Sequence, residues 1–124
     1  YGNKEIAEFL ISKGADVNAK CTGEYNKGQT PLMFASRHGK IETAELLIKK
    51  GASVNAKCTG EYNKNDTALM YASENGNKEV VELLISKGAD VNAKNNEGKT
   101  PLMYASFKGY KELFELLKKA GAKE

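Results

Sequence analysis

The hydrophobic positions of this chain form short helical stripes separated by polar, turn-rich segments. Between Lys40 and Gly51 the apolar residues follow intervals of 3, 6 and 7 from the first, with one more leucine beside them: Ile41, Ala44, Leu46, Leu47 and Ile48. Residues at these intervals share one face of a helix. Lysines in the last turn suit the helix dipole, and a glycine suits the position just after the helix. We therefore predict a helix that starts near Lys40 and ends before Gly51.

A shorter helix is expected just before it. Thr30 is a good N-cap, and Pro31 is favoured at the first helical position. An apolar run covers residues 32–35, and Gly39 is expected to end the helix soon after it. Residues 52–67 are polar and turn-rich, without a long periodic pattern. The unit is therefore a helix, a tight turn, a second helix and an extended hairpin-like loop.

The same unit recurs along the whole chain. The phrase Lys-Gly-Ala-Asp-Val-Asn-Ala-Lys, or a near copy, recurs at intervals of 37 residues, starting at Lys13, Lys50 and Lys87. The phrase that opens the shorter helix recurs at intervals of 37 and 33 residues, starting at Thr30, Thr67 and Thr100. The basic unit thus has 33 residues, and two copies carry four more. One unit cannot bury its own apolar stripe, so we expect the units to stack into a solenoid.

The repeats divide a single domain, residues 1–124, into four parts. Tyr1 and Gly2 correspond to His38 and Gly39, so the chain starts in mid-repeat, and we expect it to be a piece of a longer protein. The outer-helix position that holds Ile11, Ile48 and Ile85 holds Lys118 in the last unit, as expected for a polar cap. The predicted parts are a partial N-terminal repeat that lacks its inner helix (1–29), a full repeat with an extended loop (30–66), a second full repeat (67–99) and a C-terminal capping repeat (100–124).

These features resemble the ankyrin repeat family, whose period is 33 residues and whose motif begins Thr-Pro-Leu-His-x-Ala. The matching stretches are Thr30 to Ala35, Thr67 to Ala72 and Thr100 to Ala105, and paired leucines and the Gly-Ala-Asp-Val-Asn ending match too. The resemblance implies an all-α solenoid of stacked helix-turn-helix units joined by β-hairpin-like loops. It also implies a concave face formed by the inner helices and loop tips, and a non-enzymatic scaffold that binds another protein there.

One departure from the family motif concerns its histidine. Met33, Met70 and Met103 stand where the family usually has His, which helps to hydrogen-bond one repeat to the next. Methionine supplies flexible apolar packing instead. We therefore expect apolar packing, rather than the family's polar link, at these three positions.

The second departure is the lengthened loops. The ordinary loop tip is 94–99, whereas the tips at 20–29 and 57–66 have ten residues and share the segment Cys-Thr-Gly-Glu-Tyr-Asn-Lys. One hypothesis is that these two fingers form one recognition surface, because tyrosine offers a large contact area with few rotatable bonds. The alternative is duplication of a tolerated insertion. The hypothesis assigns anchoring to Tyr25 and Tyr62, and orientation to Glu24, Lys27, Glu61 and Lys64.

Further contact positions follow from the family resemblance. The residues before the inter-helix glycines face the concave side in the family, and here they vary from unit to unit: Arg37, His38, Glu74, Asn75, Phe107 and Lys108. The ordinary loop tip adds Asn96 and Glu97. The variation fits tuned contacts, and it fits unconstrained surface equally. For Phe107 the alternative is burial against Tyr104 or the terminal helix.

Charge and cysteine content limit the classes of partner and the compartment that fit this chain. A net charge of +3 from 19 basic and 16 acidic residues is too balanced to favour nucleic acid or a membrane surface as partner. No apolar run is long enough to span a bilayer. Two cysteines are too few for a disulfide scaffold and fit a reducing, cytoplasmic compartment. Free thiols are expected, rather than a Cys21–Cys58 disulfide or a zinc site that adds His38.

Catalysis has no support in the sequence. The chain has one histidine, His38, and no motif places a nucleophile beside it; a phosphate-binding loop and a dinucleotide motif are missing from the sequence. We expect a monomeric binding protein with no enzymatic activity and no cofactor. Two alternatives stay open, which are small-molecule or nucleotide binding in the concave groove and a structural spacer within a longer repeat array.

Overall fold

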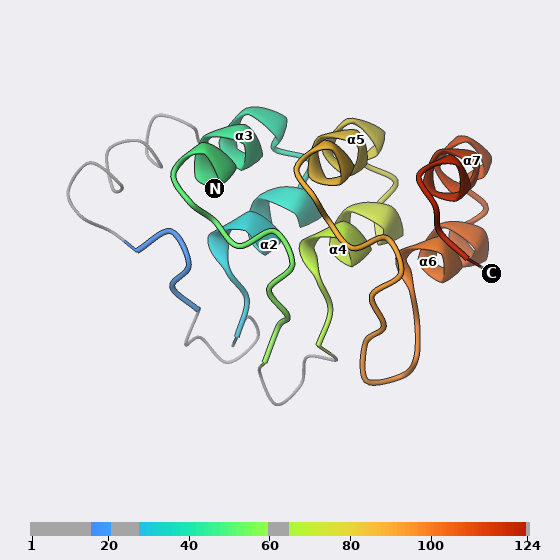
Figure 1. Cartoon of the computed structure of the whole chain (residues 1–124), viewed down its shortest axis with the longest axis horizontal. Helices are drawn as coiled ribbons and strands as arrows, with labels where there is room; N and C mark the ends of the chain where they lie inside the picture. The colour runs from blue at the N-terminus through green and yellow to red at the C-terminus, as the bar shows by residue number, and fades with distance from the viewer. Residues whose placement is uncertain (1–15, 21–27, 60–64, 124) are drawn as a thin grey trace.

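Six helices form the described part of this computed structural model, which covers residues 16–20, 28–59 and 65–123. They come in consecutive pairs, an inner and an outer helix in each: α2 (Pro31–Arg37) with α3 (Ile41–Lys49), α4 (Ala68–Glu74) with α5 (Lys78–Ser86), and α6 (Pro101–Lys108) with α7 (Lys111–Lys119). Figure 1 shows the inner helices in one row and the outer helices in another, with the loops extending away from both. The arrangement is the helical solenoid that the repeats predict.

The inner helices begin as the sequence predicts. The hydroxyl of Thr30 accepts a hydrogen bond from the backbone N–H of Met33 at 3.3 Å. Thr67 and Thr100 cap α4 and α6 in the same way, again at 3.3 Å. An N-cap hydroxyl satisfies a backbone donor that has no partner within the helix. The repeated threonine therefore fixes where each inner helix starts.

Each outer helix ends in the same hydrogen-bonded turn. After α3, the N–H of Gly51 donates to Ile48 O at 3.0 Å, and the N–H of Ala52 donates to Leu47 O at 2.9 Å. This pair of bonds is a Schellman motif, and it requires a positive φ, here 102° at Gly51. The turns at Gly88 and Gly121 repeat both bonds. The predicted role of these glycines is confirmed.

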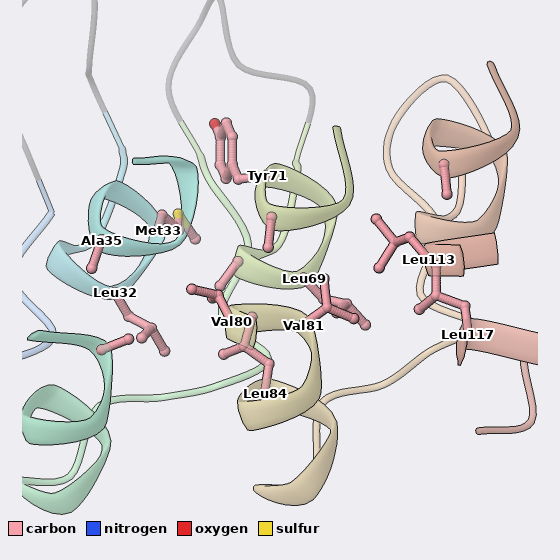
Figure 2. Close-up of a cluster of buried hydrophobic side chains, with 14 of the residues drawn as sticks. Leu32, Met33, Ala35, Leu69, Tyr71, Val80, Val81, Leu84, Leu113 and Leu117 are labelled. Atoms are coloured by element: carbon pink, nitrogen blue, oxygen red, sulfur yellow. The ribbon is translucent and has the colours of Figure 1, made fainter. Parts of the chain in front are cut away.

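The apolar core runs along the solenoid between the two rows of helices. Figure 2 shows Leu69 of α4 near Val80, Val81 and Leu84 of α5, all of which are at most 1% exposed. The predicted stripe of α3 lies on this core, with Ala44 and Leu47 buried and Ile41 and Ile48 partly buried. No helix within the described residues is long and apolar enough to cross a membrane. Burial of this continuous stripe is the main force that holds the units together.

The apolar packing expected at three methionines is found for Met33 and Met70 but not for Met103, which is 45% exposed. Met33 and Met70 are each 1% exposed. Their sulfur atoms also accept hydrogen bonds from the N–H groups of Thr30 and Thr67, at 3.4 and 3.5 Å. Sulfur is a weak acceptor, but here it completes the capping box at the start of the helix. Methionine thus links each helix to its own cap rather than to the next repeat.

Asparagines supply the polar link between repeats. The side chain of Asn55 donates to Gly88 O at 3.0 Å and accepts from the N–H of Asp90 at 2.7 Å. Asn18 and Asn92 make the same two bonds, to Gly51 O and Ser53 N, and to Gly121 O and Lys123 N. Each asparagine therefore joins the turn of one repeat to the end of the next outer helix. We call this series the asparagine ladder.

The inner turns carry a second contact between repeats. The side chain of Asn77 donates to Ser36 O at 2.9 Å and lies against Gly39. In the next repeat the ring of Tyr110 covers Gly76 at the same place. Gly39 and Gly76 have φ values of 67° and 69°, and a Cβ on either would lie 3.0 Å from the covering side chain. These glycines are needed for both reasons.

The polar cap predicted for the last repeat is confined to its outer helix. Lys118 is exposed, as expected for the position that holds isoleucine in earlier repeats. The inner helix α6, however, exposes 45% of Met103 and 87% of Phe107. The alternative of a buried Phe107 is therefore wrong. The exposure of Met103 was not predicted, because the polar cap was inferred from a single outer-helix position.

The asparagine ladder yields a stability prediction. Asn55→Ala removes two inter-repeat bonds and leaves Gly88 O and Asp90 N–H to water. We expect the free energy of unfolding to fall by about 1–2 kcal/mol, measured by urea titration. Asn75→Ala is the control, because its side chain bonds within its own repeat, to Tyr71 O. An equal loss of stability in both variants would show that the ladder bonds contribute no more than a hydrogen bond within one repeat.

Candidate binding surface

The loops between repeats are closed at their base by backbone hydrogen bonds. The N–H of Cys58 donates to Asp66 O at 2.9 Å, and the N–H of Asn95 donates to Lys99 O at 3.0 Å. These pairs are equivalent, so the four extra residues of the finger lie beyond the closing bond. The described residues of the loops form no regular strand, and the loops are hairpin-like in this limited sense.

The finger residues proposed from the sequence lie outside the described residues. Positions 21–27 and 60–64 include Glu24, Tyr25, Lys27, Glu61, Tyr62 and Lys64. Cys58, the first residue of the second shared segment, is fully buried, and Thr59 after it is exposed. The hypothesis of one surface made by two fingers stays a prediction.

A buried asparagine organises the ordinary loop. Asn95 is 7% exposed, and its side-chain oxygen accepts from the N–H groups of Glu97 and Lys99, both at 2.9 Å. Its amide nitrogen donates to Asp66 at 2.8 Å and to the hydroxyl of Tyr104 at 3.0 Å. Because it uses both ends of its side chain, Asn95 fixes the shape of the loop and attaches it to the preceding repeat.

The third member of this cluster is Tyr104. Its hydroxyl donates to Asp66 at 3.1 Å. Burial raises the pKa of Tyr104 above its ordinary value, and the charge of Asp66 and the hydrogen bond to it raise the pKa further. Loss of the phenol proton would place a second negative charge beside the Asp66 carboxylate. We call Asp66, Asn95 and Tyr104 the loop hub.

The preceding repeat has a cysteine at the position of Asn95. Cys58 shares a side-chain hydrogen bond with Tyr71. Burial is the main cause that raises the pKa of Tyr71, and this hydrogen bond raises the pKa further. Figure 2 shows Tyr71 pointing from α4 toward the loop side, away from Val80 and Leu84. Gln29, which corresponds to Asp66, is 5% exposed, and its side-chain oxygen has no hydrogen-bond partner among the described residues. The equivalent positions one repeat earlier thus hold a different set of residues, in which a thiol replaces the amide of Asn95.

The cysteine hypotheses can be compared with this placement. Cys58 is a buried thiol, and Cys21 lies outside the described residues. His38 is exposed, and its ring centroid lies 4.4 Å from that of Phe34. Among the described residues, no three potential ligands from His, Cys, Asp and Glu come together. Cys58 and His38 therefore lie in different surroundings, one in the core and one on the surface.

The predicted concave positions lie at the ends of the inner helices. Arg37 is in the last turn of α2, and His38 is its C-cap. Glu74 and Asn75 occupy the same places on α4; Glu74 is partly exposed and Asn75 is exposed. The equivalent residues of α6 are Phe107 and Lys108, both exposed. The structure therefore presents one such pair of residues on each repeat.

The ordinary loop tip places its two predicted contact residues at the surface. Asn96 accepts a hydrogen bond from the side chain of Asn65 at 2.7 Å, so it contacts the finger of the preceding repeat. Glu97 lies 3.6 Å from the ammonium group of Lys99. Both residues are exposed. The hub below them holds the tip in place, and their side chains are accessible to a partner.

The hollows on the described surface include three that lie beside the helices. One of about 780 Å³ lies between α3 and α5 and is lined by Glu45, Leu46 and Leu83, among others. Two of about 450 and 440 Å³ lie at the C-terminal end of the stack and share Ser106 and Phe114. None of the three is lined by Arg37 or His38. Of the predicted concave positions, Phe107 lines the hollow of about 450 Å³, whereas Arg37 and His38 lie on a more open surface.

The sequence reading missed the loop hub. Asp66 is 29 residues from Asn95 and 38 from Tyr104 along the chain, and each of the three residues looks unremarkable in its own repeat. One signal was available, because Asn95 replaces a cysteine in the repeat with the short loop. A change in residue type that coincides with a change in loop length indicates a position that supports the loop.

Comparison with known families supports the repeat assignment. A family model described as ankyrin repeats in three copies matches residues 1–58 and 55–124, which together cover the whole chain. A comparison with curated proteins gave no match.

The raised pKa of Tyr104 predicts a loss of stability in alkali. A group whose pKa is raised by folding stabilises the folded state below its unfolded pKa, here about 10, and this stabilisation declines as the pH rises further. Tyr104→Phe loses the hydroxyl bonds at neutral pH but cannot ionise. We expect the stability difference between wild type and variant to shrink by about 1 kcal/mol between about pH 9 and about pH 11. Urea titrations at both values measure it, and a constant difference would refute the assignment.

Proposed function

Because the chain belongs to the ankyrin repeat family, we propose that it is a non-enzymatic scaffold that binds another protein through its concave face and loops. Ankyrin repeats are generally protein-interaction modules. The finer proposal concerns the surface, which consists of the inner-helix ends, the ordinary loop tip and the two fingers.

The observation that carries the proposal is the loop hub. A loop with exposed tip residues is held by a buried side chain that makes four hydrogen bonds. A surface that is ordered before it binds loses less conformational entropy on binding, which favours affinity. The rigid base below Asn96 and Glu97 therefore fits a contact role better than an unconstrained loop.

The inner-helix ends contribute varied chemistry on a constant frame. Arg37 and His38 offer hydrogen-bond donors, Glu74 offers an acceptor, and Phe107 offers an apolar contact. These residues occupy equivalent places in successive repeats while the caps and glycines around them stay the same. In this proposal the frame fixes spacing, and the variable residues select the partner.

The fingers extend the same surface. Asn65, at the base of the second finger, contacts Asn96 of the next loop tip. Their tyrosines Tyr25 and Tyr62 are the proposed anchors, and Glu24, Lys27, Glu61 and Lys64 orient the partner through charge. Aromatic anchors surrounded by charged residues are common in protein interfaces.

The concave surface can be tested with matched variants. The partner that co-purifies with the wild-type chain is identified, and its dissociation constant is measured by calorimetry. Arg37→Ala combined with Glu74→Ala should weaken binding about tenfold or more if both side chains contact the partner. The control combines Lys49→Ala with Glu82→Ala on the outer helices, where we expect no change. Equal loss in both double variants, or in neither, would refute the proposed surface.

The finger hypothesis needs its own variants. Tyr25→Ala with Tyr62→Ala removes both proposed anchors and should reduce affinity for the same partner about tenfold or more. Circular dichroism and urea titration check that the repeats remain folded. Unchanged affinity would support the duplication alternative and limit the binding surface to the inner helices and the ordinary tip.

A further inference from the structure

The C-terminal end of the stack exposes a face that earlier repeats bury. Met33 and Met70 are each 1% exposed, whereas the equivalent Met103 is 45% exposed. Ser36 and Ser73 are buried completely, whereas Ser106 is exposed. In the described stack α4 packs against α2, and α6 packs against α4. The face of α6 that lies beyond this row is therefore continuous with an existing helix–helix interface. We call it the end face.

A backbone position on the end face is uncovered as well. Gly39 and Gly76 are covered by Asn77 and Tyr110 of the following repeat, but nothing lies within 4 Å of a Cβ placed on Gly109. The end face thus differs from the equivalent faces of earlier repeats in two ways. Its side chains are exposed, and no side chain of the described residues covers its inter-helix turn. Its geometry is that of a surface against which a helix packs.

The residues of the end face differ from those that pack repeat against repeat. Phe114 stands where Ala44 and Val81 are fully buried, and Phe107 stands where earlier repeats have Arg37 and Glu74. Small residues let helices approach closely, whereas two phenylalanines leave hollows between their rings. The hollow of about 450 Å³ is lined by Leu102, Met103, Ser106, Phe107, Phe114 and Lys123. Large apolar side chains fit such a hollow.

Lysines lie at this apolar face, and the neighbouring hollow of about 440 Å³ has both Lys111 and Glu115 in its lining. The ammonium group of Lys118 lies 5.9 Å from the centre of the Phe114 ring, and Lys123 lines the hollow. Lys108 follows Phe107 at the end of α6. Earlier repeats have Ile85, Asp90 and Asn75 at these positions. The last repeat has thus gained aromatic and basic residues together, on one face.

We propose that the end face binds an acidic amphipathic helix of another protein. The apolar side chains of that helix fill the hollows beside Phe107 and Phe114, and its carboxylates face Lys108, Lys118 and Lys123. A helix fits because the face continues a row of packed helices, and acidic residues fit because of the lysines. A second copy of the chain fits less well, because it would bring the same lysines together. The end face shares Phe107 and Lys108 with the proposed concave surface, whereas Met103, Lys118 and Lys123 belong to the end face alone, so Lys118→Glu separates the two proposals.

The test uses a defined probe. A fluorescent peptide of roughly 18 residues, long enough to form a helix, carries leucine at helical spacing and glutamate elsewhere. Fluorescence anisotropy measures its binding to the full chain. A matched peptide with lysine in place of every glutamate is the control probe. We expect binding of the acidic peptide only, with an affinity that falls as salt is added.

Variants of the chain identify the surface. Phe107→Ala should weaken binding about tenfold, as expected for an exposed aromatic anchor, and little core packing is lost because this side chain is 87% exposed. Lys118→Glu should weaken binding and reduce its salt dependence. Lys49→Glu changes the charge equally in the last turn of α3 and should leave binding unchanged. Urea titration confirms that each variant is folded.

Several outcomes would overturn the proposal. They are equal binding of the acidic and basic peptides, equal effects of Lys118→Glu and Lys49→Glu, and unchanged affinity in Phe107→Ala. Self-association in sedimentation experiments that Phe107→Ala abolishes would assign the face to a second copy instead. Binding to vesicles of anionic lipid without binding to the acidic peptide would assign it to a membrane surface.

Discussion

The asparagine ladder is the interaction on which the register of this solenoid depends. Apolar burial favours stacking, but it is non-directional and does not by itself specify how one unit sits on the next. Asn55 supplies the direction, because its side chain forms two hydrogen bonds just after the end of the next outer helix. It donates to the carbonyl of Gly88 and accepts from the N–H of Asp90. The same pair of bonds recurs at Asn18 and Asn92. Every repeat in the described part is thereby set at the same spacing.

The ladder supplies a polar link between repeats that the buried methionines do not make. Met33 and Met70 face inward and bond to the caps of their own helices, so they contribute packing but no polar link to the neighbouring repeat. The polar link lies instead at the outer turns, through asparagine, and at the inner turns, where Asn77 bonds to Ser36 O. Packing and registration are therefore carried by different residues, and a change in one leaves the other intact.

The sequence predicted most of the fold and only the outline of the site. Periodicity located both helices of a unit, and the positions of Thr30 and Gly51 defined where they begin and end, because caps act within one turn of the chain. The hub of Asp66, Asn95 and Tyr104 could not be predicted in the same way. It depends on which side chains from two repeats point to one place, and that requires the stacking geometry. The sequence could not decide whether Phe107 is exposed for the same reason, since its exposure depends on what lies beyond α6.

The contrast between Asn95 and Cys58 bears on what the two kinds of loop can do. Asn95 accepts two N–H groups of its own loop, so the backbone of the short tip is held by a buried side chain. Cys58 is directed to Tyr71 instead, and a thiol is a weak acceptor that cannot replace an amide oxygen in this role. The short tip therefore offers a partner a contact that is held by a buried amide, whereas the longer loop has a thiol at the equivalent position.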